Sequence, residues 1–212
     1  MAAALAAVAL AAAVELVGRW RRPAPPPRLV RVPDFTLRNR DGRFVARADL
    51  LGAPWVADFV FTRCAASCPL MSARMARLDR RLPAGRWLVG TAGEKVGGTA
   101  GSPVGSPAVR LVSFSVDPDF DTPAVLARYA ASFGASPRWL FLSGGREAIL
   151  RLSRDGFRLA VGGGGPAKEP ILHSTRFILV DGQGWIRRYY DALDPAAMAA
   201  LPRDAEAVAA GR

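Results

Sequence analysis

Residues 55–71 read WVADFVFTRCAASCPLM, and this stretch decides the fold expected for the chain. Residues 55–61 are almost entirely apolar and rich in β-branched and aromatic side chains, which is typical of a central, buried β-strand. Residues 69–82 carry apolar side chains at helical spacing and predict an amphipathic helix. The pattern therefore predicts a strand that turns directly into a helix, and both cysteines of the chain, Cys64 and Cys68, lie at that junction.

Strand and helix patterns alternate on both sides of this stretch. Toward the N-terminus, residues 34–37 and 43–45 predict a β-hairpin. We interpret Asp117 and residues 121–123 as turn and helix-cap chemistry, and the four glycines at 162–165 as a flexible loop. The alternation predicts an α/β fold, in which a central mixed β-sheet is flanked by helices and preceded by the N-terminal hairpin. The further strands are expected at 109–116, 139–142, 173–180 and 185–190, and the further helices at 121–133, 145–153 and 195–209.

The composition fits one folded domain with some additional chain. The 212 residues are 50% hydrophobic and 22% charged, which is typical of a globular protein. Two cysteines and one histidine exclude a zinc finger, a four-cysteine iron–sulfur cluster and a disulfide-stapled scaffold. The net charge of +11 comes from scattered basic residues, without a dense basic run interleaved with aromatic residues, so we expect no nucleic-acid binding.

The first 31 residues predict a membrane tether. Residues 1–18 read MAAALAAVALAAAVELVG, a stretch just long enough to span a bilayer or to serve as a cleaved signal. Residues 19–31 are rich in proline and arginine and predict an extended linker. The folded domain is expected at 32–212, with a flexible insertion at 90–107. We expect this domain on the extracytoplasmic, periplasmic side, either anchored to the membrane or exported and soluble.

Cys64 and Cys68 are the first candidates for chemistry. Four positions equal about one helical turn, so both sulfurs can face the same way. Helix N-terminal amides and the nearby Arg63 are expected to stabilise thiolate. Because thiolates are both metal ligands and redox nucleophiles, the pair suits either chemistry. A structural disulfide and two buried thiols are the alternatives without such a role.

His173 is the one histidine of the chain and is expected to begin the strand at 173–180. A lone histidine is often an ordinary core or surface residue. If its strand ends near Cys64 and Cys68, two thiolates and one imidazole make a soft site of low coordination number. Soft ligands select Cu(I), and the imidazole also tolerates Cu(II), whereas zinc favours a fourth ligand.

Three other side chains lie close to the cysteines in the sequence. Met71 and Met75 follow Cys68 on one helix face, and we interpret them as core packing rather than as thioether ligands. Asp58 lies six residues before Cys64 on the apolar strand. A buried carboxylate at this position can accept a thiol proton during disulfide chemistry, while the alternative is a strand residue that faces outward.

Three segments, in order, resemble the SCO/SenC family of copper chaperones. They are FTRCAASCPLM at 61–71, VSFSVDPDFDTPAVLARYA at 112–130 and HSTRFILVDGQGWIRRYY at 173–190. The resemblance covers about residues 32–190 and implies a thioredoxin-like fold, usually tethered to a membrane by an N-terminal segment. It assigns Cys64, Cys68 and His173 as copper ligands. The chain departs from the family at positions 65 and 66, where two alanines replace the usual Pro-Asp pair.

The resemblance implies a metallochaperone that delivers copper to the copper centre of cytochrome c oxidase, or that reduces the thiols of that centre. The implied partners are the copper-site subunit of the oxidase or another copper acceptor, together with a thiol reductant of the thioredoxin type. The alternative is an enzyme, a thiol–disulfide oxidoreductase with Cys64 and Cys68 as a metal-free redox pair. The similarity of Asp58 to the buried aspartate of thioredoxins keeps this alternative open.

Overall fold

A computed structural model describes residues 24–65, 67–82, 109–159, 162–163, 171–172 and 174–211. The predicted anchor at 1–18 and the predicted insertion at 90–107 lie outside these residues. Within the described part of the chain, no helix has both the length and the apolar character needed to cross a membrane.

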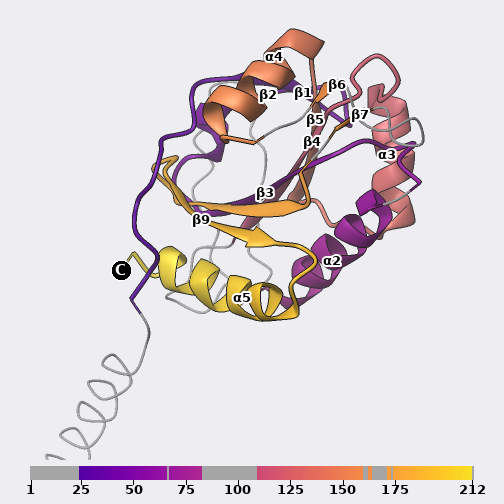
Figure 1. Cartoon of the computed structure of the whole chain (residues 1–212). Helices are drawn as coiled ribbons and strands as arrows, with labels where there is room; N and C mark the ends of the chain where they lie inside the picture. The colour runs from indigo at the N-terminus through magenta and orange to yellow at the C-terminus, as the bar shows by residue number, and fades with distance from the viewer. Residues whose placement is uncertain are drawn as a thin grey trace, which may run out of the picture.

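A mixed seven-stranded sheet forms the centre of the molecule, as the sequence predicts (Figure 1). Its strands are β1 (Thr36–Asn39), β2 (Phe44–Ala46), β3 (Trp55–Val60), β4 (Arg110–Ser115), β5 (Trp139–Ser143), β8 (Arg176–Val180) and β9 (Ile186–Asp191). They lie side by side in the order β2-β1-β5-β4-β3-β8-β9. β3, β4 and β5 run parallel to one another, and the remaining pairs are antiparallel. The sheet therefore places β3 between a parallel and an antiparallel neighbour.

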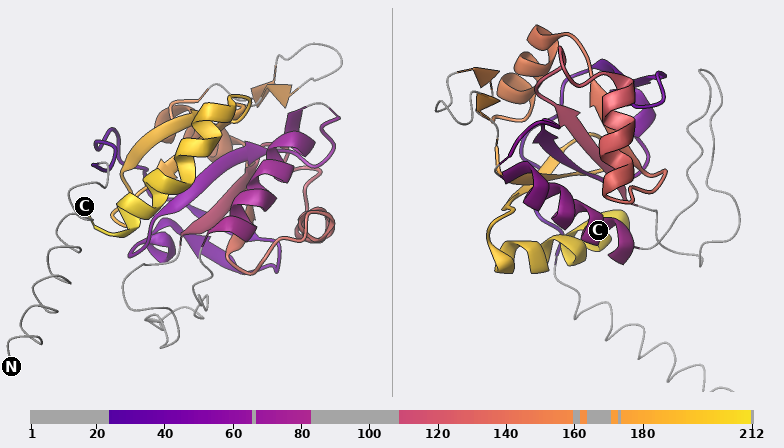
Figure 2. Two further views of the ribbon diagram at one scale, coloured as in Figure 1. Left: turned by 90° about the horizontal axis from the view of Figure 1, so that it is seen from below. Right: turned by 90° about the vertical axis from the view of Figure 1, so that its right-hand side faces the viewer.

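Helices cover both faces of this sheet. They are α2 (Ser67–Arg81), α3 (Pro123–Ser132), α4 (Arg146–Arg151) and α5 (Pro195–Ala209), with a short 3-10 helix at Arg47–Leu50 and a π-helical turn at Leu152–Gly156 that continues α4. Apart from Cys68, the buried hydrophobic residues of α2 share one cluster with those of α3 and α5, and Ile149 of α4 belongs to a second cluster. Figure 1 shows α4 and α5 on opposite sides of the sheet, and the left view of Figure 2 shows α2 and α5 on the same side.

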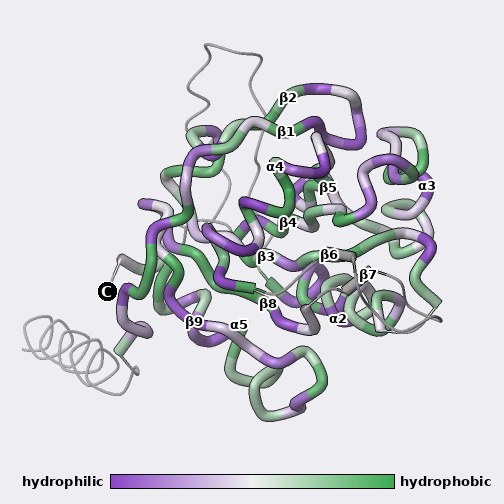
Figure 3. Tube along the Cα trace, turned by 45° about the horizontal axis from the view of Figure 1, so that its top comes forward, coloured by the Kyte–Doolittle hydropathy of each residue, from purple (hydrophilic) through white to green (hydrophobic). Residues whose placement is uncertain are grey.

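From Trp55 to Ala57 the side chains of β3 alternate between these two clusters, because successive residues of a strand point to opposite faces. Trp55 and Phe59 pack on the face covered by α4, while Val56 packs with Met71 and Met75 of α2 on the other. All six residues of β3 are buried, and Figure 3 shows hydrophobic residues concentrated along the central strands. The two methionines are completely buried, which confirms the interpretation as core packing.

The structure differs from the sequence-based prediction at two places. The strand expected from position 173 begins at Arg176, since Ser174 accepts a hydrogen bond from the Arg176 backbone in a turn. Gly162 and Gly163 form a strand, β6, rather than part of a loop. β6 (Gly162–Gly163) pairs with β7 (Ile171–Leu172), and this pairing supplies backbone hydrogen-bond partners that a glycine run would otherwise find only in water.

The described part of the predicted linker lies alongside the last hairpin of the sheet, formed by β8 and β9. The backbone N–H of Leu29 donates to the Ile186 carbonyl at 2.8 Å, and the N–H of Ile186 donates to the Val30 carbonyl at 2.8 Å. The Arg187 guanidinium donates to the Pro26 carbonyl at 2.6 Å. This segment is therefore held along β9 by backbone hydrogen bonds before the first strand begins.

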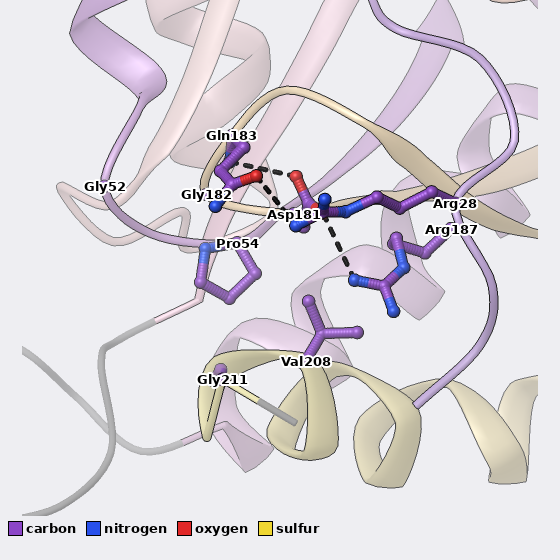
Figure 4. Close-up of a pocket in the computed structure, with 10 residues that line it drawn as sticks. Arg28, Gly52, Pro54, Asp181, Gly182, Gln183, Arg187, Val208 and Gly211 are labelled. Atoms are coloured by element: carbon purple, nitrogen blue, oxygen red, sulfur yellow. Dashed lines mark hydrogen bonds and ion pairs between the residues drawn. The ribbon is translucent and has the colours of Figure 1, made fainter. Parts of the chain in front are cut away.

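A pocket of about 630 Å³ opens where this segment meets the hairpin. Its organising group is the Asp181 carboxylate, which pairs with Arg28 at 3.4 Å and with Arg187 at 3.1 Å. Figure 4 shows both guanidinium groups directed at Asp181. The pocket is lined by neither cysteine, and its two cations already share a carboxylate, so we assign it a structural role in docking the N-terminal segment.

A buried ion pair joins the end of α2 to the start of β5. The Arg138 Nε atom donates to the Asp79 Oδ1 atom at 2.7 Å, and both side chains are buried. Asp79 also accepts hydrogen bonds from the backbone N–H and the hydroxyl of Ser136, at 2.9 and 2.8 Å. This pair orients α2, and hence Cys68 at its other end, against the sheet.

We expect Asp79→Ala to lower the free energy of unfolding by about 3–5 kcal/mol, because the substitution leaves the Arg138 guanidinium buried without its carboxylate. Urea unfolding of the reduced protein measures the change. The control is Glu147→Ala, which breaks an exposed pair with Arg151 and is expected to change the free energy by less than about 0.5 kcal/mol. Equal losses in the two variants would contradict the role assigned to the buried pair.

Candidate metal centre

The two cysteines lie on either side of the start of α2. β3 ends at Val60, and Cys64 follows in an irregular turn in which its backbone N–H donates to the Phe61 carbonyl at 3.3 Å. Cys68 is the second residue of α2. The helix expected from position 69 begins two residues earlier, at Ser67, so Cys68 lies in its first turn while Cys64 lies in the turn before it.

The turn nevertheless brings the two side chains together. Neither cysteine is in a disulfide, and the Cys68 thiol is hydrogen-bonded with the Cys64 side chain and with the backbone of Phe61. Cys64 is 7% exposed and Cys68 is completely buried. The structure thus confirms a pair of adjacent thiols at the end of β3, of which Cys64 is the more accessible.

The electrostatic environment of the pair differs from the sequence-based expectation. Burial raises the pKa of the Cys68 thiol, and interactions with Cys64 and Asp58 raise it further, against the hydrogen bond from the Phe61 backbone. The Arg63 guanidinium does not offset this, because it pairs with the buried Asp117 carboxylate at 2.5 Å. The expectation of a stabilised thiolate is thus wrong for Cys68, because its environment favours the protonated thiol.

Two carboxylates from the loop between β4 and α3 hold the turn that carries Cys64. The Asp121 carboxylate accepts hydrogen bonds from the hydroxyl and the backbone N–H of Thr62, at 2.5 and 3.2 Å, and Asp117 accepts from Arg63. The predicted turn and cap chemistry is present too, since Thr122 caps α3. Sequence reasoning missed the side-chain contacts, although both aspartates stand in the second segment of the family resemblance.

Asp58 is completely buried on the sheet face covered by α2. The Ser113 hydroxyl donates to its Oδ1 atom at 2.6 Å, and its Oδ2 atom has no hydrogen-bond partner among the described residues. Burial raises the pKa of Asp58, and this effect outweighs the opposing effect of the Ser113 hydrogen bond, so that the pKa is about 7. The alternative of an outward-facing residue is wrong, and the carboxyl group can exchange a proton near neutral pH.

His173 lies outside the described residues, so the predicted third ligand has no described geometry. Ser174 and β8 follow it. Across the described residues, no group of three or more histidine, cysteine or carboxylate side chains is arranged to hold a metal ion. The described part of the candidate site is therefore the thiol pair with its supporting turn.

Comparison with known proteins points to one family. The family model described as SCO1/SenC matches residues 24–89 and 99–203 of the chain. A curated relative, the SCO1 protein homolog of Bacillus subtilis, is 32% identical over 165 residues, which cover 77% of this chain and 75% of the relative.

Solved structures agree with this family and fold. A SCO1/SenC family lipoprotein from Bacillus anthracis superposes with a TM-score of 0.68 at 30% identity, covering 87% of this chain and 97% of that structure. BsSco, described as a member of the Sco family of cytochrome c oxidase assembly proteins with a disulfide switch, has a TM-score of 0.68 at 28% identity and covers 90% of this chain and 99% of its own. The fold is therefore the thioredoxin-like fold of Sco proteins.

The fold also matches a Sco protein that was solved with its metal. ScoI of Bradyrhizobium japonicum with copper bound has a TM-score of 0.55 at 21% identity, covering 82% of this chain and 99% of that structure. At this identity the likeness concerns the fold.

The raised pKa of Asp58 predicts a pH dependence of stability. The unfolded chain loses the Asp58 proton above about pH 4, whereas the folded protein keeps it to about pH 7, so this group lowers the stability as the pH rises between these values. We expect Asp58→Asn to raise the free energy of unfolding at pH 8 by up to about 4 kcal/mol and to have little effect at pH 4. Urea unfolding at both pH values measures this, and a gain independent of pH would contradict the assignment.

Proposed function

The chain belongs to the SCO1/SenC family, and we propose that it binds copper through Cys64, Cys68 and His173 and supplies this copper to the assembly of cytochrome c oxidase. Copper is the cargo in this proposal rather than a permanent cofactor. The observation that carries the proposal is the pair of contacting, non-bridged thiols at the end of β3. Two sulfur donors that already lie together favour a soft ion such as Cu(I).

Burial differs between the two thiols, and this difference supports transfer. Cys64 is slightly exposed, while Cys68 is completely buried within the first turn of α2. An acceptor thiol can therefore approach a copper ion from the side of Cys64, with Cys68 as the ligand that is released last. Because a metal-bound thiol must lose its proton, the raised pKa of Cys68 also implies that copper binding weakens as the pH falls.

The register of β8 supports His173 as the third ligand. β8 runs antiparallel to β3, with Ala57 opposite Ile178 and Trp55 opposite Val180. The N-terminal end of β8 therefore lies at the edge of the sheet where β3 ends and the turn of Cys64 begins. The imidazole would add a nitrogen donor that accepts both Cu(I) and Cu(II).

The proposed partner and location rest on the descriptions of relatives in the same family. One Sco relative is described as a cytochrome c oxidase assembly protein, and another as a lipoprotein. We propose a domain held at the outer face of the membrane through its N-terminal region, which serves the copper-site subunit of the oxidase and is reduced by a thioredoxin-type partner. At position 65 this chain has an exposed alanine, so a partner would meet a neutral, small side chain beside Cys64.

A second candidate function is thiol–disulfide exchange without metal, and Asp58 is the observation that favours it. A buried carboxyl group with a pKa of about 7, whose charge acts on Cys68, can accept the proton of that thiol when a disulfide forms. In this reaction Cys64 and Cys68 together release two electrons and two protons to a partner disulfide and form one S–S bond. A related protein is described as containing a disulfide switch.

Copper binding tests the first proposal. We expect Cys64→Ser and Cys68→Ser each to abolish Cu(I) binding by the reduced protein, because only one of the two thiolate ligands is left. We expect His173→Ala to weaken Cu(I) binding and to change the Cu(II) absorption spectrum. Competition with a Cu(I) chelator and Cu(II) titration measure these effects. Met75→Leu, a buried substitution of similar volume, is the control and should leave both unchanged.

The same variants separate the two candidate functions. Thiol–disulfide exchange requires both cysteines but not His173, so a His173→Ala protein with full copper affinity and unchanged spectra would contradict the three-ligand site. Fast disulfide exchange in a wild-type protein that binds no copper would instead support the redox function. Asp58→Asn should then slow disulfide exchange at pH 7, which stopped-flow measurement with a small disulfide records.

A further inference from the structure

The turn that carries Cys64 depends on side chains from another part of the chain. It lies between two rigid elements, β3 and α2, but residues 61–65 belong to neither. Inside the turn, the 3.3 Å hydrogen bond from Cys64 to Phe61 is long for a backbone pair. Besides the hydrogen bonds of Cys68 with the Cys64 side chain and the Phe61 backbone, contacts of the turn with another part of the chain hold Cys64 in position.

Asp121 supplies the strongest of these contacts that the structure describes. Its carboxylate is completely buried and accepts hydrogen bonds from the Thr62 hydroxyl at 2.5 Å and from the Thr62 backbone at 3.2 Å. Hydrogen bonds to a carboxylate are stronger than neutral ones, and burial strengthens them. The ion pair of the neighbouring Arg63 has a half-exposed guanidinium, so solvent screens it and it constrains the turn less.

Asp121 is itself held in place on three sides. The Ser115 hydroxyl, at the end of β4, donates to the Asp121 carboxylate at 2.6 Å. The backbone N–H of Asp121 donates to the Asp117 carbonyl at 2.9 Å. The next residue, Thr122, caps α3. β4 is paired with β3, and directly after β4 the Val116 backbone N–H donates to the Val60 carbonyl at 2.9 Å. The Asp121 carboxylate, which is bound to the end of β4, is therefore fixed relative to the end of β3, where the turn starts.

We propose that Asp121 is a positioning residue for Cys64, which sets the spacing and orientation of the two thiols by holding Thr62. The hydrogen bonds are present in the dithiol state, and Cys68 is anchored separately by the packing of α2. Removing the contact to Thr62 therefore frees the turn but not the helix, and lowers the constraint that keeps the thiols in their reduced geometry. The copper part of the test below rests on the proposed function, and the disulfide part does not.

Thr62→Val tests this role, because valine has nearly the same shape as threonine but lacks the hydroxyl that Asp121 binds. The measurement is the equilibrium with glutathione, in which Cys64 and Cys68 form one disulfide while glutathione disulfide takes up two electrons and two protons to give two glutathione molecules. We expect the equilibrium constant for disulfide formation to rise about tenfold, which corresponds to a potential about 30 mV more negative. Cu(I) affinity should fall about tenfold.

Two variants serve as controls. Thr62→Ser keeps the hydroxyl and should stay within twofold of the wild type in both measurements. Asp119→Asn removes a carboxylate from the same loop whose partner is the exposed Arg146, and it should change neither. Thermal unfolding of the reduced and oxidised forms completes the set, because a general loss of stability would lower both melting temperatures equally and leave the potential unchanged.

The outcomes separate the positioning role from the proposed function. An unchanged potential in folded Thr62→Val, or an equal shift in Thr62→Ser, would overturn the role of Asp121. A shifted potential in a protein whose wild type binds no copper would support the positioning role and contradict the copper proposal. Shifts in both potential and copper affinity, restored in Thr62→Ser, would support both.

Discussion

The burial of β3 on both faces of the sheet is the constraint on which the site depends. This strand lies between β4 and β8 and has no exposed residue, so its backbone pairs on both sides within the sheet and its side chains are buried. Where the strand ends at Val60, the chain must leave the core and begin α2 within a few residues. Cys64 and Cys68 occupy this passage, which brings the two thiols into contact.

Carboxylates surround this passage, and burial raises the pKa of Asp58 and of Asp121 against the hydrogen bonds that each accepts. Asp121 and Asp117 face the turn, and Asp58 lies beneath the helix on β3. For a protein selected for stability alone, apolar residues would pack better at these positions. Their presence beside Cys64 and Cys68 fits a site in which the geometry and the proton balance of two thiols matter, whether the thiols bind copper or exchange a disulfide.

The sheet and most helices were predictable because local patterns carry them. The strand at 55–61 and the helix at 195–209 are visible as an apolar run and as a helical repeat opened by a proline, and the structure has them within one residue at Trp55–Val60 and Pro195–Ala209. The start of α2 and the strand β6 were not predicted correctly. The turn before Ser67 is held by the distant Asp121, and β6 consists of two glycines, which have no side chains to give a strand pattern.

The sequence by itself determined the family, the alternation of strands and helices, and the position of both cysteines at one strand-to-helix junction. These features depend on residue types and on short spacings. Only the tertiary structure decided that burial raises the pKa of the Cys68 thiol, that Arg63 is paired with Asp117, and that Asp121 holds Thr62. Burial and charge pairing decide the pKa of a group, and they arise when residues separated by more than fifty positions meet at the end of one strand.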